Sequence, residues 1–321
     1  MSDQKIMFVF PGQGSQYAGM GSDLCAEFPI ARRIYEQANE VLGYDIQALS
    51  AHGPEEELGL TRHTQPALLT HSIACLEVFR DLTGGNVQPA MAAGHSLGEY
   101  SALVAAGVVS FEDGLRLVKR RGELMGQYGE GGMLALGLTL EEAGPLAARF
   151  FCQVGTCNLP EQTVVGGTEE DLAALEKALP DLFPRKRATR LKTEGAFHTY
   201  LMIPAAREFR AVLNEVDFGT ANFPVLSNYT GAAHEDDPNT IRTRLFFQLF
   251  NPVKWRTCMR TAVAFGITQF IEFGGGIGQG EGPADKKPNL QGIINRNLRA
   301  LECEATYAAA INVQTLRETA A

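Results

Sequence analysis

Short apolar runs alternate with helical patterns along most of this chain. Residues 6–10 are wholly apolar, a pattern typical of a strand buried on both faces, and residues 269–273 are also strand-like, with three apolar residues of five. Helical periodicity extends over three early segments, residues 24–42, 66–81 and 97–106. Pro66 is expected at the first position of its helix, and Gly107 ends the third segment. Strands that alternate with helices predict an α/β fold with a mainly parallel sheet covered on both faces.

The pattern changes after Gly129. Strand-like stretches cover residues 133–138, 152–158, 162–167 and 187–192. Helical stretches lie between them, one opened by Thr139 with Glu142 in a capping box and one opened by Thr168 with Asp171. The order β-α-β-β-α-β is that of a ferredoxin-like, or split βαβ, unit. We therefore expect a large α/β-hydrolase-like domain of residues 1–128 and 196–321, with a ferredoxin-like subdomain inserted at 129–195.

After this insertion, the patterns of the large domain resume. Helices are expected over 201–215, 239–249 and 255–266, and a strand over 224–228. Residues 274–288 are rich in Gly, Pro and charged residues, which predicts a loop.

Composition narrows the classes of function. The 321 residues carry a net charge of −9, which argues against nucleic acid or an anionic membrane as the main partner. The six cysteines form no C-x-x-C pair and the six histidines no metal-ligand spacing, so we expect reduced thiols, no metal and no cofactor. Residues 1–5 carry no signal-peptide pattern and no apolar run reaches membrane-spanning length, so we expect a cytoplasmic protein.

One segment is basic, although the chain as a whole carries a negative net charge. It holds five cations within eight residues, namely Arg185, Lys186, Arg187, Arg190 and Lys192. We call these five residues the basic segment. Charge of this kind is common on a solvated strand edge, where it prevents edge-to-edge pairing. It also suits a docking surface for an acidic partner or for ligand phosphates, and both interpretations stay open.

The first candidate for chemistry is Ser96, in the G-x-S-x-G pentapeptide formed by residues 94–98. A short strand-like run precedes this pentapeptide and a helical pattern follows it. In such a turn the serine hydroxyl is exposed, and the helix N-terminus behind it offers N–H groups to a developing oxyanion. The geometry suits acyl transfer, although five residues with two glycines also arise by chance.

Ser96 needs a base, and two histidines compete for the role. His95 is its neighbour in sequence, but adjacent side chains diverge in such a turn, so we expect it to be a scaffold residue. His198 lies where the small subdomain returns to the large domain, and ligand sites favour such crevices. A surface histidine at the start of a helix is the alternative for His198. The backbone N–H groups of Gln13 and Leu97 can supply the oxyanion hole.

Arg121 lies on the apolar face of an amphipathic helix expected over residues 112–128, opened by Ser110 with Asp113. Lys119 and Arg120 point away from that face. A guanidinium on a buried face needs an anionic partner, because an unpaired buried charge is costly. The partner is either an Asp or Glu of the chain or the anionic group of a substrate.

Six segments together carry a resemblance. They are Phe10-Pro11-Gly12-Gln13-Gly14-Ser15-Gln16, Thr64-Gln65-Pro66-Ala67, Gly94-His95-Ser96-Leu97-Gly98-Glu99-Tyr100, Arg121-Gly122-Glu123-Leu124-Met125, Gly195-Ala196-Phe197-His198 and Asn251-Pro252-Val253-Lys254-Trp255. In these segments, and in their order, the chain resembles the malonyl-CoA:acyl-carrier-protein transacylases and related acyltransferase domains of fatty-acid and polyketide synthesis. The resemblance extends to about residue 275.

The resemblance implies a role for each matching residue. Ser96 would be the nucleophile and His198 its base, oriented by the main-chain carbonyl of Gln248. The N–H groups of Gln13 and Leu97 would form the oxyanion hole. The substrate would be bound by three further residues: Arg121 on the malonyl carboxylate, Phe197 against an α-methyl group, and Gln65.

The implied reaction is ping-pong transfer of malonyl from malonyl-CoA to the phosphopantetheine thiol of an acyl carrier protein. Carrier proteins are typically acidic, so the basic segment becomes a docking candidate. An acyl-thioester hydrolase and a non-catalytic carrier-binding scaffold are the alternatives. The chain departs from the family's pattern after residue 274, where a proline and a short loop are usual and Gly275 and a longer stretch stand instead.

Overall fold

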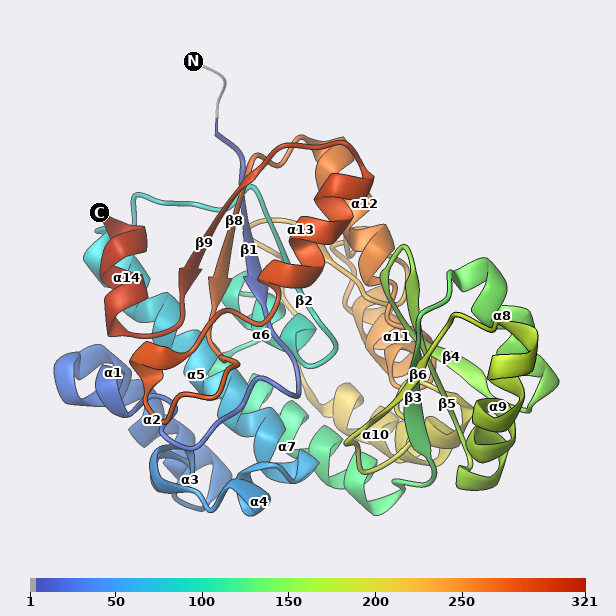
Figure 1. The fold of residues 1–321 in the computed structure, drawn as a ribbon. Coiled ribbons are helices and arrows are strands. Elements are labelled where there is room, and N and C mark those ends of the chain that lie inside the picture. Colours follow the sequence, from blue (N-terminus) through green and yellow to red (C-terminus); the bar gives the residue numbers. More distant parts are fainter. Residues whose placement is uncertain (1–3) are drawn as a thin grey trace.

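The computed structural model describes residues 4–321, so the expectation drawn from residues 1–5 falls partly outside it. A five-stranded sheet forms the centre of the large domain (Figure 1), with strands in the order β7-β2-β1-β8-β9. These strands are β1 (Ile6–Phe10), β2 (Met91–Gly94), β7 (Val225–Leu226), β8 (Gln269–Phe273) and β9 (Thr306–Ala310). All four pairings are parallel, as the sequence predicts.

Alternation along β1 explains why helices cover both faces of this sheet. Phe8 and Phe10 pack into one hydrophobic cluster, whereas Met7 and Val9 pack into another on the opposite face. The first face is covered mainly by α2 (Pro29–Leu42), α5 (Thr61–Leu82), α6 (Gly98–Ala105), α7 (Phe111–Gln127), α10 (Ile203–Glu215) and α14 (Val313–Ala320). The second is covered by α12 (Trp255–Phe265) and α13 (Gln291–Ala300). The short helices α1 (Ser22–Glu27), α3 (Ile46–His52) and α4 (Glu55–Leu58) and the longer α11 (Pro238–Gln248) complete the domain.

A second sheet is antiparallel and has the order β4-β5-β3-β6. Its elements follow the predicted β-α-β-β-α-β order: β3 (Gly132–Leu136), α8 (Leu140–Arg149), β4 (Gln153–Leu159), β5 (Gln162–Gly167), α9 (Glu169–Leu182) and β6 (Ala188–Leu191). Both helices pack with one face of the sheet in a separate cluster. On the other face, Met133, Ala135 and Val164 join the core of the large domain. The boundaries at residues 129 and 195 stay a prediction.

The prediction for Pro66 was wrong. The helix begins five residues earlier, at Thr61, and Pro66 lies inside it. Its start carries no side-chain cap from Leu60; instead the N–H of Thr61 donates to the carboxylate of Glu194, far away in the sequence. Local sequence holds no signal for such a cap. Proline removes only one helical hydrogen bond here, and the burial of nearly the whole helix compensates for that loss.

Other differences are smaller. The pattern over 24–42 is two helices, because Phe28 is extended and Pro29 opens the second. Residues 274–288 form the expected loop, with a short 3-10 turn (Pro283–Asp285) and a bridge between Ile277 and Lys287. Within residues 4–321, every helix falls short of the length or the apolar character that crossing a bilayer requires.

Candidate active site

The turn between β2 and α6 forces Ser96 into an unusual backbone conformation, with a φ of 52°. Glycines make the turn possible, because a Cβ on Gly94 would lie 1.8 Å from the backbone carbon of Gly98. A Cβ on Gly98 would lie 2.1 Å from the carbonyl oxygen of Phe10. Such distances exclude any side chain at either position. The turn thus seats the Ser96 hydroxyl at the carboxyl end of β2, the edge of a parallel sheet where ligands bind.

His198 meets Ser96 from the segment that returns from the small sheet. Its Nε2 lies 2.7 Å from Ser96 Oγ, and its Nδ1 lies 2.7 Å from the main-chain oxygen of Gln248. A carbonyl only accepts, so Nδ1 carries the proton and Nε2 accepts from the serine hydroxyl. Burial, and then the nearby Arg121 cation, lowers the pKa of His198 to about 3. The imidazole is therefore neutral and able to take up a proton.

Arg121 approaches the same oxygen from the buried face of α7. The side chain is 1% exposed, as its place on the apolar face predicts. Its Nη1 donates to Gln65 Oε1 at 2.9 Å, and its Nη2 donates to Ser96 Oγ at 3.2 Å and to Gln248 Oε1 at 3.0 Å. Among residues 4–321, no carboxylate forms an ion pair with this guanidinium, so the internal salt bridge left open by the sequence is not formed.

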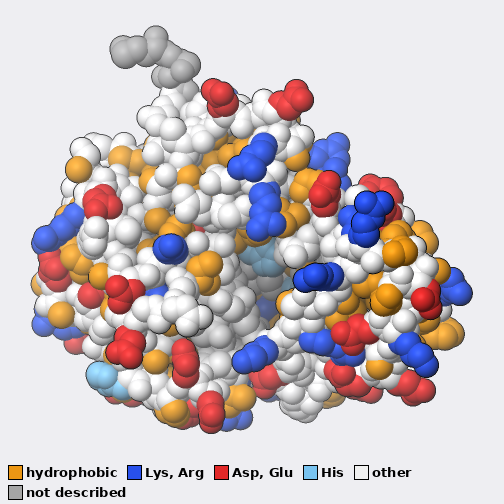
Figure 2. Space-filling view, viewed as in Figure 1, with side chains coloured by type: hydrophobic (Ala, Val, Ile, Leu, Met, Phe, Trp, Pro, Cys, Tyr) orange, Lys and Arg blue, Asp and Glu red, His pale blue; other side chains and the backbone are white. Residues whose placement is uncertain are grey.

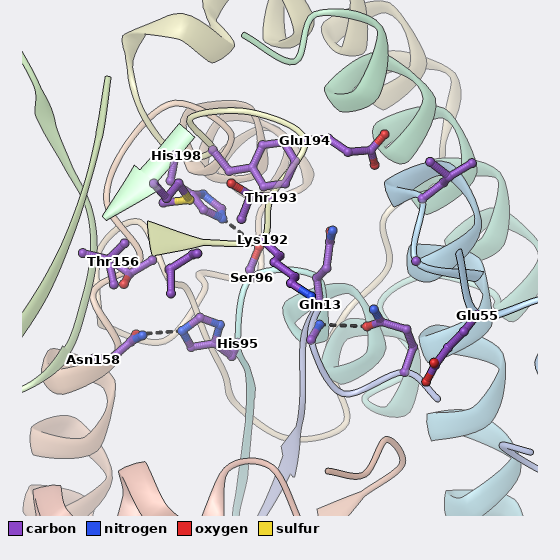
Figure 3. Close-up of a pocket in the computed structure, with 18 of the residues that line it drawn as sticks. Gln13, Glu55, His95, Ser96, Thr156, Asn158, Lys192, Thr193, Glu194 and His198 are labelled. Atoms are coloured by element: carbon purple, nitrogen blue, oxygen red, sulfur yellow. Dashed lines mark hydrogen bonds between the residues drawn. The ribbon is translucent and has the colours of Figure 1, made fainter. Parts of the chain in front are cut away.

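A cavity of about 980 Å³ opens in front of Ser96, between the two sheets. Figure 2 shows the hollow, with histidine side chains at its bottom and Lys and Arg side chains along its edges. In Figure 3, Ser96 and His198 lie next to each other in the lining of the cavity, which also includes Lys192 and Glu55. Phe197 and Gln13 also line the cavity, whereas Gln65 lies beneath it in contact with Arg121.

Comparison with known proteins agrees with this geometry. A sequence profile of the acyl transferase domain matches residues 7–274. The malonyl CoA-acyl carrier protein transacylase of Bacillus subtilis is 38% identical over 98% of both chains. The structure of the malonyl CoA-acyl carrier protein transacylase of Coxiella burnetii superposes with a TM-score of 0.88 at 32% identity, over 98% of this chain and 96% of the other. The chain belongs to the malonyl CoA-acyl carrier protein transacylase family. It is therefore an enzyme of the acyltransferase class.

A further similar structure bears on the partner of such transacylases. It is that of a type II PKS acyl-carrier protein in complex with its malonyl-transacylase. The transacylase matches with a TM-score of 0.86 at 35% identity, over 98% of each chain.

The remaining candidate residues, Leu97, Gln13 and His95, differ in their positions in the transacylase site. Leu97 occupies the N-cap position of α6, directly after Ser96, and Gln13 follows β1 at the same sheet edge. Their roles as oxyanion donors stay predictions. His95 lines the cavity, but its Nε2 pairs with Asn158 Oδ1 at 2.7 Å and its ring packs on Trp255.

The basic segment is only partly available to a partner. Its five residues lie on and beside β6, an edge strand of the antiparallel sheet. Arg190 is held by Glu169 and Glu176, each at 2.8 Å. The other four cations are exposed, and Lys192 reaches the cavity.

Sequence reasoning missed two buried residues of this site. Asn228 stands in a formal glycosylation sequon, yet it is fully buried and its Oδ1 accepts the Ser96 N–H at 2.6 Å. Glu99 lies one turn after Ser96 and is also fully buried. A local signal existed for Glu99, because it is the one charged residue in the otherwise uncharged helix α6. Asn228 had none, since its partner lies 132 residues away.

Proposed function

We propose that the protein transfers a malonyl group from malonyl-CoA to the phosphopantetheine thiol of an acyl carrier protein, through an ester on Ser96. One observation carries the proposal. The Ser96 hydroxyl lies between a neutral, buried histidine at 2.7 Å and a buried guanidinium at 3.2 Å. The first contact suits a nucleophile and its base, and the second places a receptor for a carboxylate beside the reacting oxygen.

Acylation follows from these contacts. Ser96 Oγ attacks the thioester carbonyl carbon while its proton moves to His198 Nε2. The C–S bond then breaks, and the proton passes from His198 to the departing CoA sulfur. The imidazolium formed in between is stabilised by the main-chain oxygen of Gln248, since Nδ1 donates to it. The N–H groups of Gln13 and Leu97 would hold the oxyanion. Transfer to the carrier thiol repeats these steps in reverse.

Selectivity for a carboxylated acyl group is the role that we assign to Arg121. A substrate carboxylate can replace the contact of Nη2 with Ser96 Oγ and give the guanidinium the anion that its burial requires. Gln65 holds Nη1 and thereby keeps the plane of the guanidinium fixed. Phe197 is 5% exposed and lines the cavity next to His198, where its ring would leave little room for an α-methyl group.

An acyl carrier protein is the partner that we propose, in line with the complex reported for the similar transacylase. Exposed cations of the basic segment offer charge complementary to an acidic carrier. Lys192 connects that surface to the cavity, so a phosphopantetheine arm could enter beside it.

The test is to mix the protein with malonyl-CoA or acetyl-CoA and record its intact mass. A stable malonyl adduct that Ser96→Ala abolishes supports transfer. Rapid CoA release without an adduct would support the acyl-thioester hydrolase instead. Absence of both adduct and CoA release would leave only a non-catalytic scaffold.

Arg121→Ala tests the carboxylate receptor. Malonyl loading should fall by about 100-fold or more, because the substrate carboxylate loses its buried partner, and acetyl loading should change far less. Arg120→Ala is the matched control, since Arg120 neighbours Arg121 in the chain but forms exposed ion pairs with Glu123 and Glu208. Equal loss of malonyl and acetyl loading in Arg121→Ala would contradict the assignment.

A further inference from the structure

A buried carboxylate lies behind the catalytic residues, on the far side of Gln248 from Arg121. Glu99 is fully buried on α6 and has three hydrogen-bond donors around it. Its Oε2 accepts from the N–H of Asn228 and from Nε2 of Gln248, each at 2.9 Å. Its Oε1 accepts from Nε2 of His234 at 2.8 Å. The carboxylate is thus fully hydrogen-bonded in the charged form, as a buried acid must be.

The side chain of Gln248 connects this carboxylate to the arginine. Its Oε1 accepts from Arg121 Nη2 at 3.0 Å, and its Nε2 donates both to Glu99 and to the carbonyl of Ser96 at 2.9 Å. A guanidinium only donates and an ionised carboxylate only accepts. The Gln248 amide can satisfy both groups in one orientation only, with its oxygen toward Arg121 and its nitrogen toward Glu99.

This arrangement also places the negative charge of Glu99 near the positive charge of Arg121. Arg121 is a buried cation without a direct ion pair among residues 4–321, and Glu99 is a buried carboxylate one amide away, which also contacts His234 Nε2 at 2.8 Å. A carboxylate in direct contact with Arg121 would compete with the substrate for the same N–H groups. A carboxylate separated by an amide lowers the cost of burying the cation and leaves those groups accessible to a substrate.

We propose that Glu99 is a positioning residue for acyl selectivity: through the amide of Gln248 it orients and charge-balances Arg121 for a substrate carboxylate. The inference rests on the proposed function, because it takes Arg121 as the carboxylate receptor. A purely structural role for Glu99 would have a different effect on acyl selectivity. Glu99 also holds the N–H of Asn228, which holds Ser96, so structural damage would impair every acyl donor alike.

Glu99→Gln is the decisive variant. A glutamine at this position keeps the length of the side chain but removes its negative charge, so Arg121 loses its charge balance and the hydrogen bond from Gln248 Nε2 is no longer charge-assisted. The ratio of malonyl to acetyl loading rates should fall about tenfold, the value of one good hydrogen bond to a charged group. Loading is read by intact mass at matched donor concentrations.

Glu272→Gln is the matched control. Glu272 is a fully buried carboxylate on β8 that also has three donors, the N–H groups of Asn289 and Leu290 and the hydroxyl of Tyr307. Within residues 4–321, none of these partners forms a hydrogen bond with Arg121, Gln248 or Ser96. The same substitution there should leave the malonyl-to-acetyl ratio unchanged, even where it lowers the melting temperature.

Two further variants, Gln248→Met and Arg121→Ala, distinguish failure of the inference from failure of the proposed function. If Glu99→Gln does not fold, Gln248→Met removes the same amide bridge, retains the main-chain carbonyl and should lower the same ratio. Parallel loss of malonyl and acetyl loading in the variant that folds overturns the inference. If Arg121→Ala lowers the ratio and neither Glu99→Gln nor Gln248→Met does, the inference fails and the proposed function stands. If Arg121→Ala itself leaves the ratio unchanged, the carboxylate assignment fails, and the inference with it.

Discussion

At the scale of single residues, the environment of His198 sets the conditions for catalysis. The imidazole is buried, and the cationic Arg121 lies on the other side of the Ser96 oxygen. Both features disfavour the charged imidazolium, and they lower the pKa of His198 to about 3. The proposed base is thus unprotonated at neutral and mildly acidic pH, and among residues 4–321 no carboxylate raises its pKa.

This pKa predicts the pH dependence of loading. A histidine with its ordinary pKa near 6.5 would lose activity as the pH falls through that value, but His198 should stay neutral well below it. We expect the rate of acetyl loading to be nearly constant between about pH 5 and pH 7. Arg121→Ala removes the cation that lowers the pKa, so its acidic limb should move to higher pH. A wild-type profile with a midpoint near 6.5 would contradict the prediction.

The residue scale also shows what sequence could provide. The exposed turn at Ser96 and the apolar-face position of Arg121 followed from local pattern, because both depend on neighbours within one helix or turn. The partners of Asn228 and Glu99 did not, since they come from segments more than 120 residues away. Hydrogen bonds of that kind appear only once the sheet has brought its strand ends together.

At the scale of elements, β6 and the segments that flank it suit two roles, as a protected sheet edge and as the proposed docking surface. Its edge position calls for charge that blocks strand pairing, and the exposed cations provide it. Arg190 is engaged with the acids of α9, which fixes the helix to the sheet. Arg187 and Lys192 flank the strand without an ion pair in the described part of the chain, so they are free to meet a partner.

The double variant Arg187→Glu with Lys192→Glu tests docking by this element. Protein preloaded with malonyl and freed of CoA should transfer more slowly to an acyl carrier protein, by about tenfold at low salt. Transfer to a short uncharged thiol such as N-acetylcysteamine should be unaffected. Arg32→Glu with Arg33→Glu, on exposed positions of α2, is the control with the same charge change. Equal slowing in both double variants would show that net charge alone matters.

At the scale of the whole molecule, parallel strand order explains why residues from distant segments meet. Gln13, Ser96 and Asn228 each follow a strand of one parallel sheet, so all three lie at its carboxyl edge. The alternating strand and helix patterns predicted this sheet and the inserted ferredoxin-like unit. They gave no indication of the helix start at Thr61, because its cap is the carboxylate of Glu194. Contacts between segments far apart in the sequence are the part that local pattern could not predict.

Titratable groups that burial affects make the stability of the whole fold depend on pH. Burial lowers the pKa of His71 to about 4 and, together with Arg121, that of His198 to about 3. Burial raises the pKa of Glu272 to about 7, against the hydrogen bonds that it accepts. Burial also lowers the pKa of His95 and of His63. Between about pH 4.5 and pH 6.5 the unfolded chain therefore binds more protons at these four histidines, and the folded chain binds one more at the glutamate.

The balance predicts that stability rises with pH in this window. Each net proton corresponds to about 1.4 kcal/mol per pH unit in the free energy of unfolding. Glu272→Gln removes the opposing proton, so the slope should become steeper by about 1.4 kcal/mol per pH unit, whereas His71→Gln should make it shallower by about the same amount. Denaturant unfolding at pH 5, 5.5, 6 and 6.5 measures all three slopes. If wild-type stability is constant over this range, or if Glu272→Gln leaves the slope unchanged, then these groups do not control the acid stability of the fold.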